Sequence, residues 1–277
     1  MRSKDHPHSA SFGLPASIKS FLSRQSMIST CLLIIALLAF PAYAANFQIQ
    51  PTSLELGGSV KSGAFSVING GNEKLNVQIS AKEWFQDAEG KDVFEEAKDL
   101  VFFPKIMTVE PNEQRAIRIG VKVPAALQEK TFRLFVEEIP SPQKNSDGKQ
   151  AGKITAGLTI AFRFSTPIFV KPVQPKESGI IEKIGMSGGA VKATIKNAGN
   201  VHFKLMTVTF SGKAIDGKEL FSKEVAGWYV LHGKSRPFEV VVPQEFCGSL
   251  ATIDVAAKAE NFTIDGTLNV QKNMCSH

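Results

Sequence analysis

Residues 157–172 read GLTIAFRFSTPIFVKP and carry the clearest strand pattern in the chain. Four large apolar side chains occupy every second position of the first half: Leu158, Ile160, Phe162 and Phe164. Successive side chains of an extended chain leave opposite faces, so this alternation predicts a strand with one apolar face. Pro167 cannot donate a ladder hydrogen bond, which favours a sheet edge. The apolar stripe therefore packs into its own domain or serves another protein.

Short alternating runs of the same kind recur between turn residues from Asn46 to the end of the chain. No window longer than a turn or two predicts an amphipathic helix, so the sequence predicts an all-β fold of β-sandwich type. One turn motif occurs in both halves, as NGGN at residues 69–72 and as NAGN at residues 197–200. Gly and Asn readily adopt the positive φ of tight turns, which predicts such turns at both places.

The repeated motif predicts two sandwich domains, at residues 45–172 and 173–277. The linker between them, VKPVQPKES at residues 170–178, contains two prolines. Proline stiffens a linker, so we expect the domains to be held at a fixed angle.

Residues 1–44 predict a cleaved signal peptide. Lys19 and Arg24 precede the apolar run Cys31–Phe40, and the small-x-small site Ala42-Tyr43-Ala44 follows. This order is typical of secretory leaders. The apolar run is shorter than the roughly 20 residues that span a bilayer, so stable membrane insertion is not expected. The sequence leaves open whether translation starts at Met1 or at Met27.

The exported part of the chain would carry 28 basic and 25 acidic residues, a net charge of +3. It has no cluster of basic residues on a predicted helix, which argues against nucleic-acid binding. Two cysteines remain after the leader, Cys247 and Cys275. In an exported chain an even pair predicts a disulfide, and the alternative is two free buried thiols.

The sequence offers no catalytic or metal-binding pattern. No histidine lies at metal-ligand spacing from another histidine or a cysteine. Ser235 lies three residues from His232 in an apparent turn, which is no catalytic triad, and neither GxSxG nor a P-loop occurs. We therefore expect a binding protein without catalytic residues, metal or cofactor.

Several segments together carry a family resemblance. They are PTSLEL (51–56), VINGGN (67–72), FFPKIMTVEPNEQRAIRIG (102–120), RLFVEEIP (133–140), IFVKP (168–172) and IKNAGNVHFKL (195–205). In this order, after an export signal, they resemble the periplasmic chaperones of pilus assembly by the chaperone–usher route. Two of the segments, KEWFQDAEGKDV (82–93) and RLFVEEIP, are closer to the archaic branch of that family.

The resemblance implies two immunoglobulin-like β-sandwich domains, a periplasmic location, and two partners, a pilin subunit and an outer-membrane usher. Such chaperones lend the last strand of their first domain to a subunit that lacks a strand, by β-augmentation. Leu158, Ile160, Phe162 and Phe164 match the donated side chains, and each contributes about 1.5–3 kcal/mol on burial. Without a subunit, the exposed stripe would allow self-association.

One pair of residues departs from the family pattern. Typical members hold the subunit's terminal carboxylate with an Arg on the first strand and a Lys on the last strand, and the matching positions here are Ser53 and Pro167. As replacement anchors we expect Arg118 and Arg133, on two strands that should flank the cleft between the domains. Weaker candidates are Arg163 and Lys171. The alternative is that these cations are solvated or paired within the chain.

Two other functions stay open at this point. One is a secreted surface, adhesive or structural tandem β-sandwich protein. The absence of a separate donor extension at the mature amino terminus weakens that interpretation. The other is a small-ligand or carbohydrate-binding module, which would need more exposed aromatic side chains with polar tips than Trp84, Trp228 and Tyr229 provide.

Overall fold

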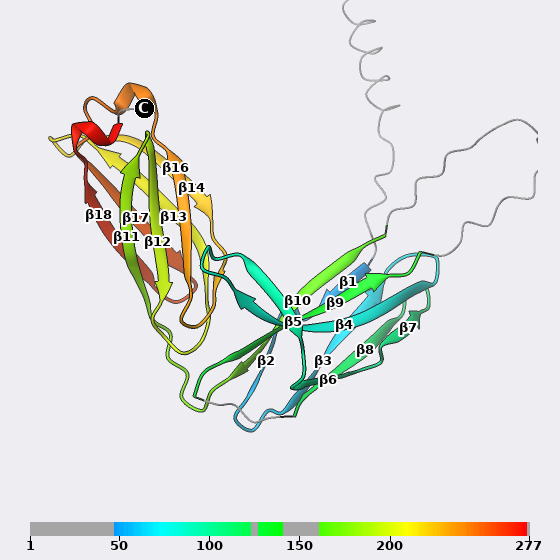
Figure 1. Ribbon diagram of the computed structural model, residues 1–277. Helices are drawn as coiled ribbons and strands as arrows, with labels where there is room; N and C mark the ends of the chain where they lie inside the picture. Colours follow the sequence, from blue (N-terminus) through cyan, green and yellow to red (C-terminus); the bar gives the residue numbers. More distant parts are fainter. Residues whose placement is uncertain (1–46, 123–126, 141–160, 276–277) are drawn as a thin grey trace, which may run out of the picture. The chain divides into compact units, whose positions relative to one another are not determined.

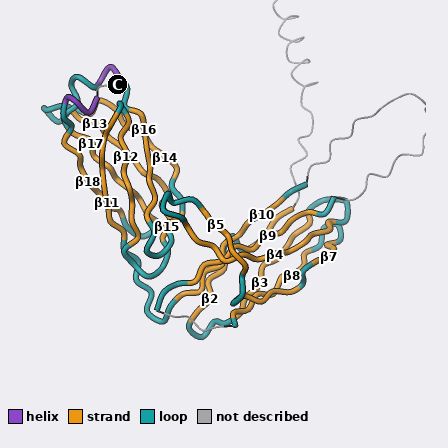
Figure 2. The backbone as a smooth tube through the Cα atoms, in the orientation of Figure 1, coloured by secondary structure: helices purple, strands orange, loops and turns teal. Residues whose placement is uncertain are grey.

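The computed structural model describes residues 47–122, 127–140 and 161–275, and almost all of its regular structure is strand (Figures 1 and 2). Two short 3-10 helices, η1 (Gln244–Phe246) and η2 (Lys272–Cys275), complete it. The predicted all-β class is therefore confirmed. The predicted signal peptide, with Leu158 and Ile160, lies outside the described residues. In the described part, no helix is long and apolar enough to cross a membrane.

The first sandwich consists of two sheets. One has the strand order β1-β3-β8-β6, and the other has the order β2-β10-β9-β4-β5 with β7 also paired to β4. The bounds are β1 (Phe47–Gln50), β2 (Leu54–Gly57), β3 (Ser62–Asn69), β4 (Leu75–Gln86), β5 (Asp92–Glu96), β6 (Leu100–Phe103), β7 (Ile106–Val109), β8 (Gln114–Val121), β9 (Lys130–Glu138) and β10 (Arg163–Lys171). All pairings are antiparallel except that of β10 with β2.

The second sandwich has the same two-layer plan. Its sheets have the orders β11-β12-β16 and β14-β13-β17-β18, with β15 paired to β13. The bounds are β11 (Gly179–Ser187), β12 (Ala190–Asn197), β13 (Phe203–Lys213), β14 (Glu219–Ala226), β15 (Tyr229–Val230), β16 (Ser235–Val241), β17 (Thr252–Ala259) and β18 (Thr263–Asn269). A disulfide joins Cys247 after η1 to Cys275 in η2, with their Cα atoms 5.7 Å apart. The expectation of a disulfide is met.

Alternating apolar side chains build each core. In β3, Phe65 and Val67 are fully buried, and Phe65 pairs with the buried Ile117 of β8. Intervening residues such as Arg118 are exposed, as the period of two requires. Each sandwich has its own apolar cluster.

The chain changes sheets at Pro51. β1 pairs with β3 in one sheet, and β2 pairs with β10 in the other, with a cis peptide bond between Gln50 and Pro51. Because Pro51 cannot donate to a ladder, it is compatible with the end of a pairing. The sequence predicted a kink or a change of partner here, and the structure has the change of partner.

The two NxGN turns are equivalent, but not for the reason that we expected. Neither Gly71 nor Gly199 has a positive φ. Instead, Asn69 and Asn197 are buried side chains that accept a hydrogen bond from the amide two residues ahead, Gly71 and Gly199, at 3.0 and 2.8 Å. The expectation of positive φ is wrong because the Asn side chain itself closes the turn.

Each of these asparagines also ties its turn to the core. The amide nitrogen of Asn69 donates to the carbonyls of Glu73 and Val109, and that of Asn197 donates to the carbonyls of Val201 and Val230. Buried carbonyl groups need partners, so these side chains stabilise the fold.

We expect Asn197→Ala to lower the free energy of unfolding by about 2–4 kcal/mol, because two buried carbonyls lose their donor. Urea unfolding followed by circular dichroism measures the loss. The matched control is Asn72→Ala, at an exposed residue of the first turn, where a change within about 0.5 kcal/mol is expected. Equal losses in the two variants would contradict this account of the turns.

Candidate functional site

Strand β10 has two different halves. Ile168–Lys171 pairs with β2 on one side, and its residues up to Val170 pair with β9 on the other, whereas Arg163–Pro167 pairs only with β9. Arg163–Pro167 therefore lies at a sheet edge, where backbone groups on one side have no strand partner. Thr166 partly fills this side, because its hydroxyl donates to the carbonyl of Thr52 at 2.7 Å. Pro167 is the last residue of the edge half.

The two described members of the apolar stripe differ in burial. Phe162 is 39% exposed, and its carbonyl accepts a hydrogen bond from the amide of Glu138, which continues the pairing with β9. Phe164 packs against the first core, with its ring 4.6 Å from that of Phe47. Phe164 therefore packs partly into its own domain, which was one of the two alternatives for the stripe.

Arg133 is the most unusual polar side chain of the first sandwich. It lies on β9 directly opposite Pro167 of β10, so the two side chains share one face of the sheet. Only 5% of Arg133 is exposed. Its guanidinium carbon lies 3.8 Å from the ring centre of Trp84 and 5.5 Å from that of Tyr229. These are cation–π distances.

Two donors of Arg133, Nε and Nη2, are buried without a hydrogen-bond partner among the described residues. The two atoms lie on the same edge of the planar guanidinium, which is the fork that binds a carboxylate bidentately. Burial lowers the pKa of Arg133, and the nearby Asp92 opposes this shift. The side chain remains a cation at physiological pH. An unpaired buried cation of this shape is suited to bind an anion.

Arg118 does not belong to this site. It lies on β8 in the other sheet, opposite Ala64 and Phe103. Ile117 and Ile119 point into the core, so Arg118 points out on the far side of the sandwich from Arg133. The expectation that both arginines flank one cleft is wrong, because the strand IRIG belongs to the sheet that does not contain β9.

The two weaker candidates are already paired. The Nε of Arg163 lies 2.7 Å from Glu137, and its guanidinium lies over the ring of Phe135. Lys171 forms an ion pair with Glu55 at 2.7 Å. Both cations therefore have intramolecular partners, which was the stated alternative.

The hairpin of β4 and β5 brings residues of the second sandwich to Arg133. Gln86 at the end of β4 donates to the carbonyl of Tyr229 at 2.9 Å and accepts from the amide of Leu231 at 3.0 Å. At the hairpin tip, Arg236 donates to the carbonyl of Gly90. A Cβ on Gly90 would lie 3.0 Å from the carbonyl of Ser235, so the close approach requires glycine.

A second set of contacts lies at the start of β9. The side chain of Glu129 is fully buried and accepts from the amide and the Nδ1 of His202, at 2.7 and 2.8 Å. The His202 ring stacks on Phe169 of β10, with centroids 3.4 Å apart. Trp84, Phe169 and Leu231 form an apolar cluster beside this pair. The two sandwiches are thus joined by buried polar and aromatic contacts.

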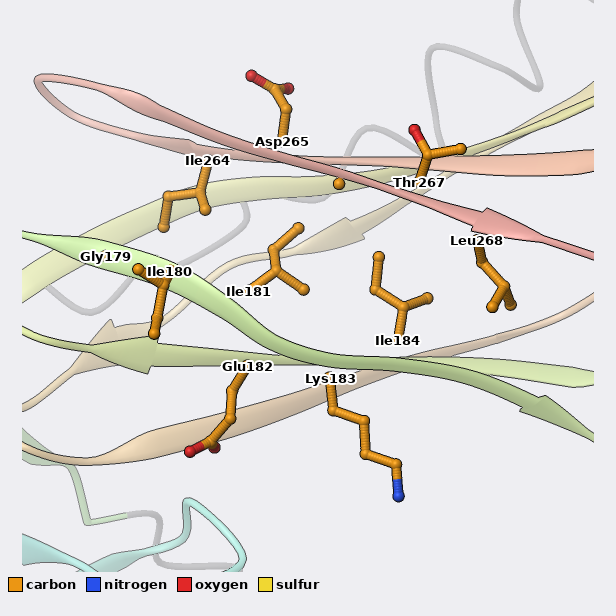
Figure 3. Close-up of a pocket in the computed structure, with 11 residues that line it drawn as sticks. Gly179, Ile180, Ile181, Glu182, Lys183, Ile184, Ile264, Asp265, Thr267 and Leu268 are labelled. Carbon is orange, nitrogen blue, oxygen red and sulfur yellow. The ribbon is translucent and has the colours of Figure 1, made fainter.

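A pocket of about 520 Å³ lies in the second sandwich between the edge strands β11 and β18 (Figure 3). Ile181, Ile184, Ile264 and Leu268 point into the space between the strands, and Asp265 points away from it. Glu182, the acid on β11, is bound by Lys196 and Ser235, at 3.0 and 2.9 Å. These neighbours lower the pKa of Glu182. The pocket has no converging polar groups that suit a substrate.

The described residues contain no cluster of three His, Cys, Asp or Glu side chains able to hold a metal ion. Ser235 bonds to Glu182, and the Nδ1 of His232 lies 2.9 Å from the carbonyl of Gly199. These two side chains have separate structural partners. The site around Arg133 and the edge of β10 is therefore the candidate.

Comparison with known families decides the affiliation. Residues 46–176 match the family model described as "Pili and flagellar-assembly chaperone, PapD N-terminal domain". The chain belongs to the pilus chaperone family of the chaperone–usher pathway. The match covers both sheets of the first sandwich and every residue of the candidate site that this sandwich contributes. A comparison with curated protein sequences finds no match.

Solved structures of pilus chaperones share the fold of this family member. One is the CsuC–CsuE chaperone–tip adhesin pre-assembly complex of archaic Csu pili from Acinetobacter baumannii, with 20% identity, 79% of this chain and 98% of that chain covered, and a TM-score of 0.54. A second is the class 5 fimbriae chaperone CfaA, with 15% identity, 82% of this chain and 100% of that chain covered, and a TM-score of 0.51. A third is the chaperone YadV, with 17% identity, 81% of this chain and 100% of that chain covered, and a TM-score of 0.51. They confirm the two-domain immunoglobulin-like architecture.

Sequence reasoning missed the residues of this pilus chaperone that enclose Arg133. Gln86 and Asp92 lie in KEWFQDAEGKDV, a segment that served in the sequence analysis only to indicate the archaic branch of the family. Trp228 of the second sandwich donates from its indole to Asp92 at 3.1 Å. The sequence offered one signal for Gln86 and Asp92, which is that they lie close to Trp84 in a predicted strand and turn. Nothing in the sequence links that turn to Trp228.

We expect Gln86→Ala to loosen the joint while each sandwich stays folded. The Leu231 amide and the Tyr229 carbonyl lose their partners, which costs about 1–3 kcal/mol for each group left unpaired. Amide hydrogen exchange at Leu231 measures the effect, with at least tenfold faster exchange expected. Gln78→Ala on the same strand is the control, since it lies at an exposed position far from Leu231. Unchanged exchange in Gln86→Ala would contradict the role of this side chain.

Proposed function

We propose that this chain is a periplasmic chaperone that binds pilin subunits by donor-strand complementation and delivers them to an outer-membrane usher. The observation that carries the proposal is the pairing of an open sheet edge with an unpartnered buried cation. The edge is Arg163–Pro167 of β10, and the cation is Arg133, directly opposite Pro167. The segments KEWFQDAEGKDV and RLFVEEIP favour the archaic branch of the family for this chain.

The edge supports strand donation. An extended segment of a subunit can pair with the free side of β10, with main-chain bonds supplying affinity and alternate side chains filling pockets. Phe162 is exposed and lies next to this half of the strand. Leu158 and Ile160 precede it at the same period, and their role as donated side chains remains a prediction.

Arg133 supports an anchor for the subunit's terminal carboxylate. Typical members place a lysine where this chain has Pro167, and Arg133 on the neighbouring strand occupies the same level and the same face. Its free edge, formed by Nε and Nη2, matches the two oxygens of a carboxylate. In this proposal Arg133 on β9 replaces the lysine that typical members carry on β10, and the two positions are paired neighbours in the sheet.

Arg118 is better suited to the second partner. It lies beside Phe103, which is 74% exposed, and Val101 of the same strand, β6, is also exposed. An exposed apolar group of this kind marks an interaction surface. The surface lies on the opposite sheet from β10, so it stays free when a subunit is bound. We propose that it contacts the usher.

Phe162→Asp is expected to reduce subunit affinity by at least about 100-fold, because a buried aromatic contact is replaced by a charge without a partner. Its effect on the melting temperature should be small, since Phe162 is already partly exposed. The measurement is co-purification with a pilin subunit encoded in the same gene cluster, expressed in the periplasm. The control is Ile215→Asp, at a highly exposed residue of the β13–β14 turn.

Two outcomes would count against strand donation. A large loss of the chaperone's own stability in Phe162→Asp would show that the stripe is core. Failure of the unaltered chain to bind any neighbouring small protein would favour a secreted structural β-sandwich protein.

Phe103→Asp distinguishes binding of the subunit from binding of the usher. We expect it to retain subunit binding and to lose binding of the subunit complex to the usher, by about tenfold or more for one buried aromatic contact. A pull-down with the usher's periplasmic amino-terminal domain measures this. Loss of subunit capture, or unchanged usher binding, would contradict the assignment of the surface.

A further inference from the structure

The free edge of Arg133 is covered in this structure. Its Nε and Nη2 have almost no accessible surface. A carboxylate that binds this fork must therefore displace whatever covers it. Three aromatic rings lie within cation–π range of the guanidinium, namely those of Trp84, Trp228 and Tyr229.

The three rings differ in how firmly they are held. Trp84 is fully buried, and it packs on Phe169 and Tyr229. Tyr229 is half-buried, and its carbonyl is fixed by Gln86. Trp228 is 39% exposed, and its ring centre lies 5.7 Å from the guanidinium carbon. Trp228 is thus the ring that can move with the least loss of buried contact.

One polar contact holds Trp228 in place. Its indole nitrogen donates to Oδ2 of Asp92 at 3.1 Å, and the other oxygen of Asp92 accepts from Gln86 at 3.2 Å. Asp92 belongs to the first sandwich, and Trp228 belongs to the second. The Asp92 carboxylate is also close enough to Arg133 to act on its charge, but it makes no hydrogen bond to Nε or Nη2.

We propose that Asp92 and Trp228 form a latch that closes the Arg133 site in the free chaperone and opens when a subunit's carboxylate enters. This inference rests on the proposed function. Asp92 supplies the compensating negative charge while the site is empty, and Trp228 excludes water from the fork. An incoming carboxylate competes with Asp92 for the same cation, because both are anions near one guanidinium.

The latch predicts that weakening it improves binding. If only about one tenth of the free molecules are open, opening all of them raises the apparent affinity about tenfold. Trp228→Phe keeps an aromatic ring and removes the indole donor. Asp92→Asn keeps the size of the side chain and removes the competing charge. Both variants should associate with the subunit faster than the unaltered chain does.

The experiment is stopped-flow association with a fluorescently labelled pilin subunit, supported by acrylamide quenching of tryptophan. Trp84 and Trp228 are the only tryptophans, and only Trp228 is exposed to quencher in the structure. We expect an on-rate increase of about tenfold in both variants. We also expect stronger quenching in Asp92→Asn and a change in quenching of the unaltered chain when the subunit binds.

The control is Asp265→Asn, which makes the same charge change at an exposed residue of the second sandwich. Melting temperatures establish that each variant is folded. Unchanged on-rates in Trp228→Phe and Asp92→Asn, with unchanged quenching on binding, would overturn the latch. If Arg133→Met also left binding unchanged, the carboxylate anchor would fail as well, so the two failures are distinguishable.

Discussion

A cation buried without a hydrogen-bonding anion is the dominant constraint in this structure. Taking the Arg133 guanidinium out of water costs free energy unless other groups compensate. The face of Trp84 provides part of the compensation, at 3.8 Å. The charge of Asp92 provides another part. The fork of Nε and Nη2 receives none. In the proposed function, the subunit's terminal carboxylate is the ligand that completes this fork.

The contacts between the two sandwiches lie beside Arg133. Gln86, Asp92 and Gly90 reach the second sandwich from one hairpin, and Glu129 reaches His202 from the start of β9. Phe169 of β10 also stacks on His202, so β9 and β10, the strands next to the proposed subunit site, contact the second sandwich too. Asp92 and Trp228 belong both to these contacts and to the surroundings of the proposed binding site, so a substitution at either residue should affect both.

The fold was predictable because it depends on periodicity. Alternation in segments such as GAFSVIN and QRAIRIG marks the core faces of β3 and β8, and the repeated NxGN turns mark two similar domains. The site was only partly predictable. Arg133 was among the candidates, but its separation from Arg118 depends on which sheet each strand joins. Trp228 and Asp92 are 136 residues apart, and only the tertiary fold brings them together.

The most direct test of the central claim is a structure of the mature chain bound to a pilin subunit from the same gene cluster. The account predicts that the subunit's terminal carboxylate lies within hydrogen-bonding distance of Nε and Nη2 of Arg133, with the strand through Phe162 paired into the subunit. A complex in which the carboxylate lies elsewhere, with Arg133 still unpartnered, would contradict it.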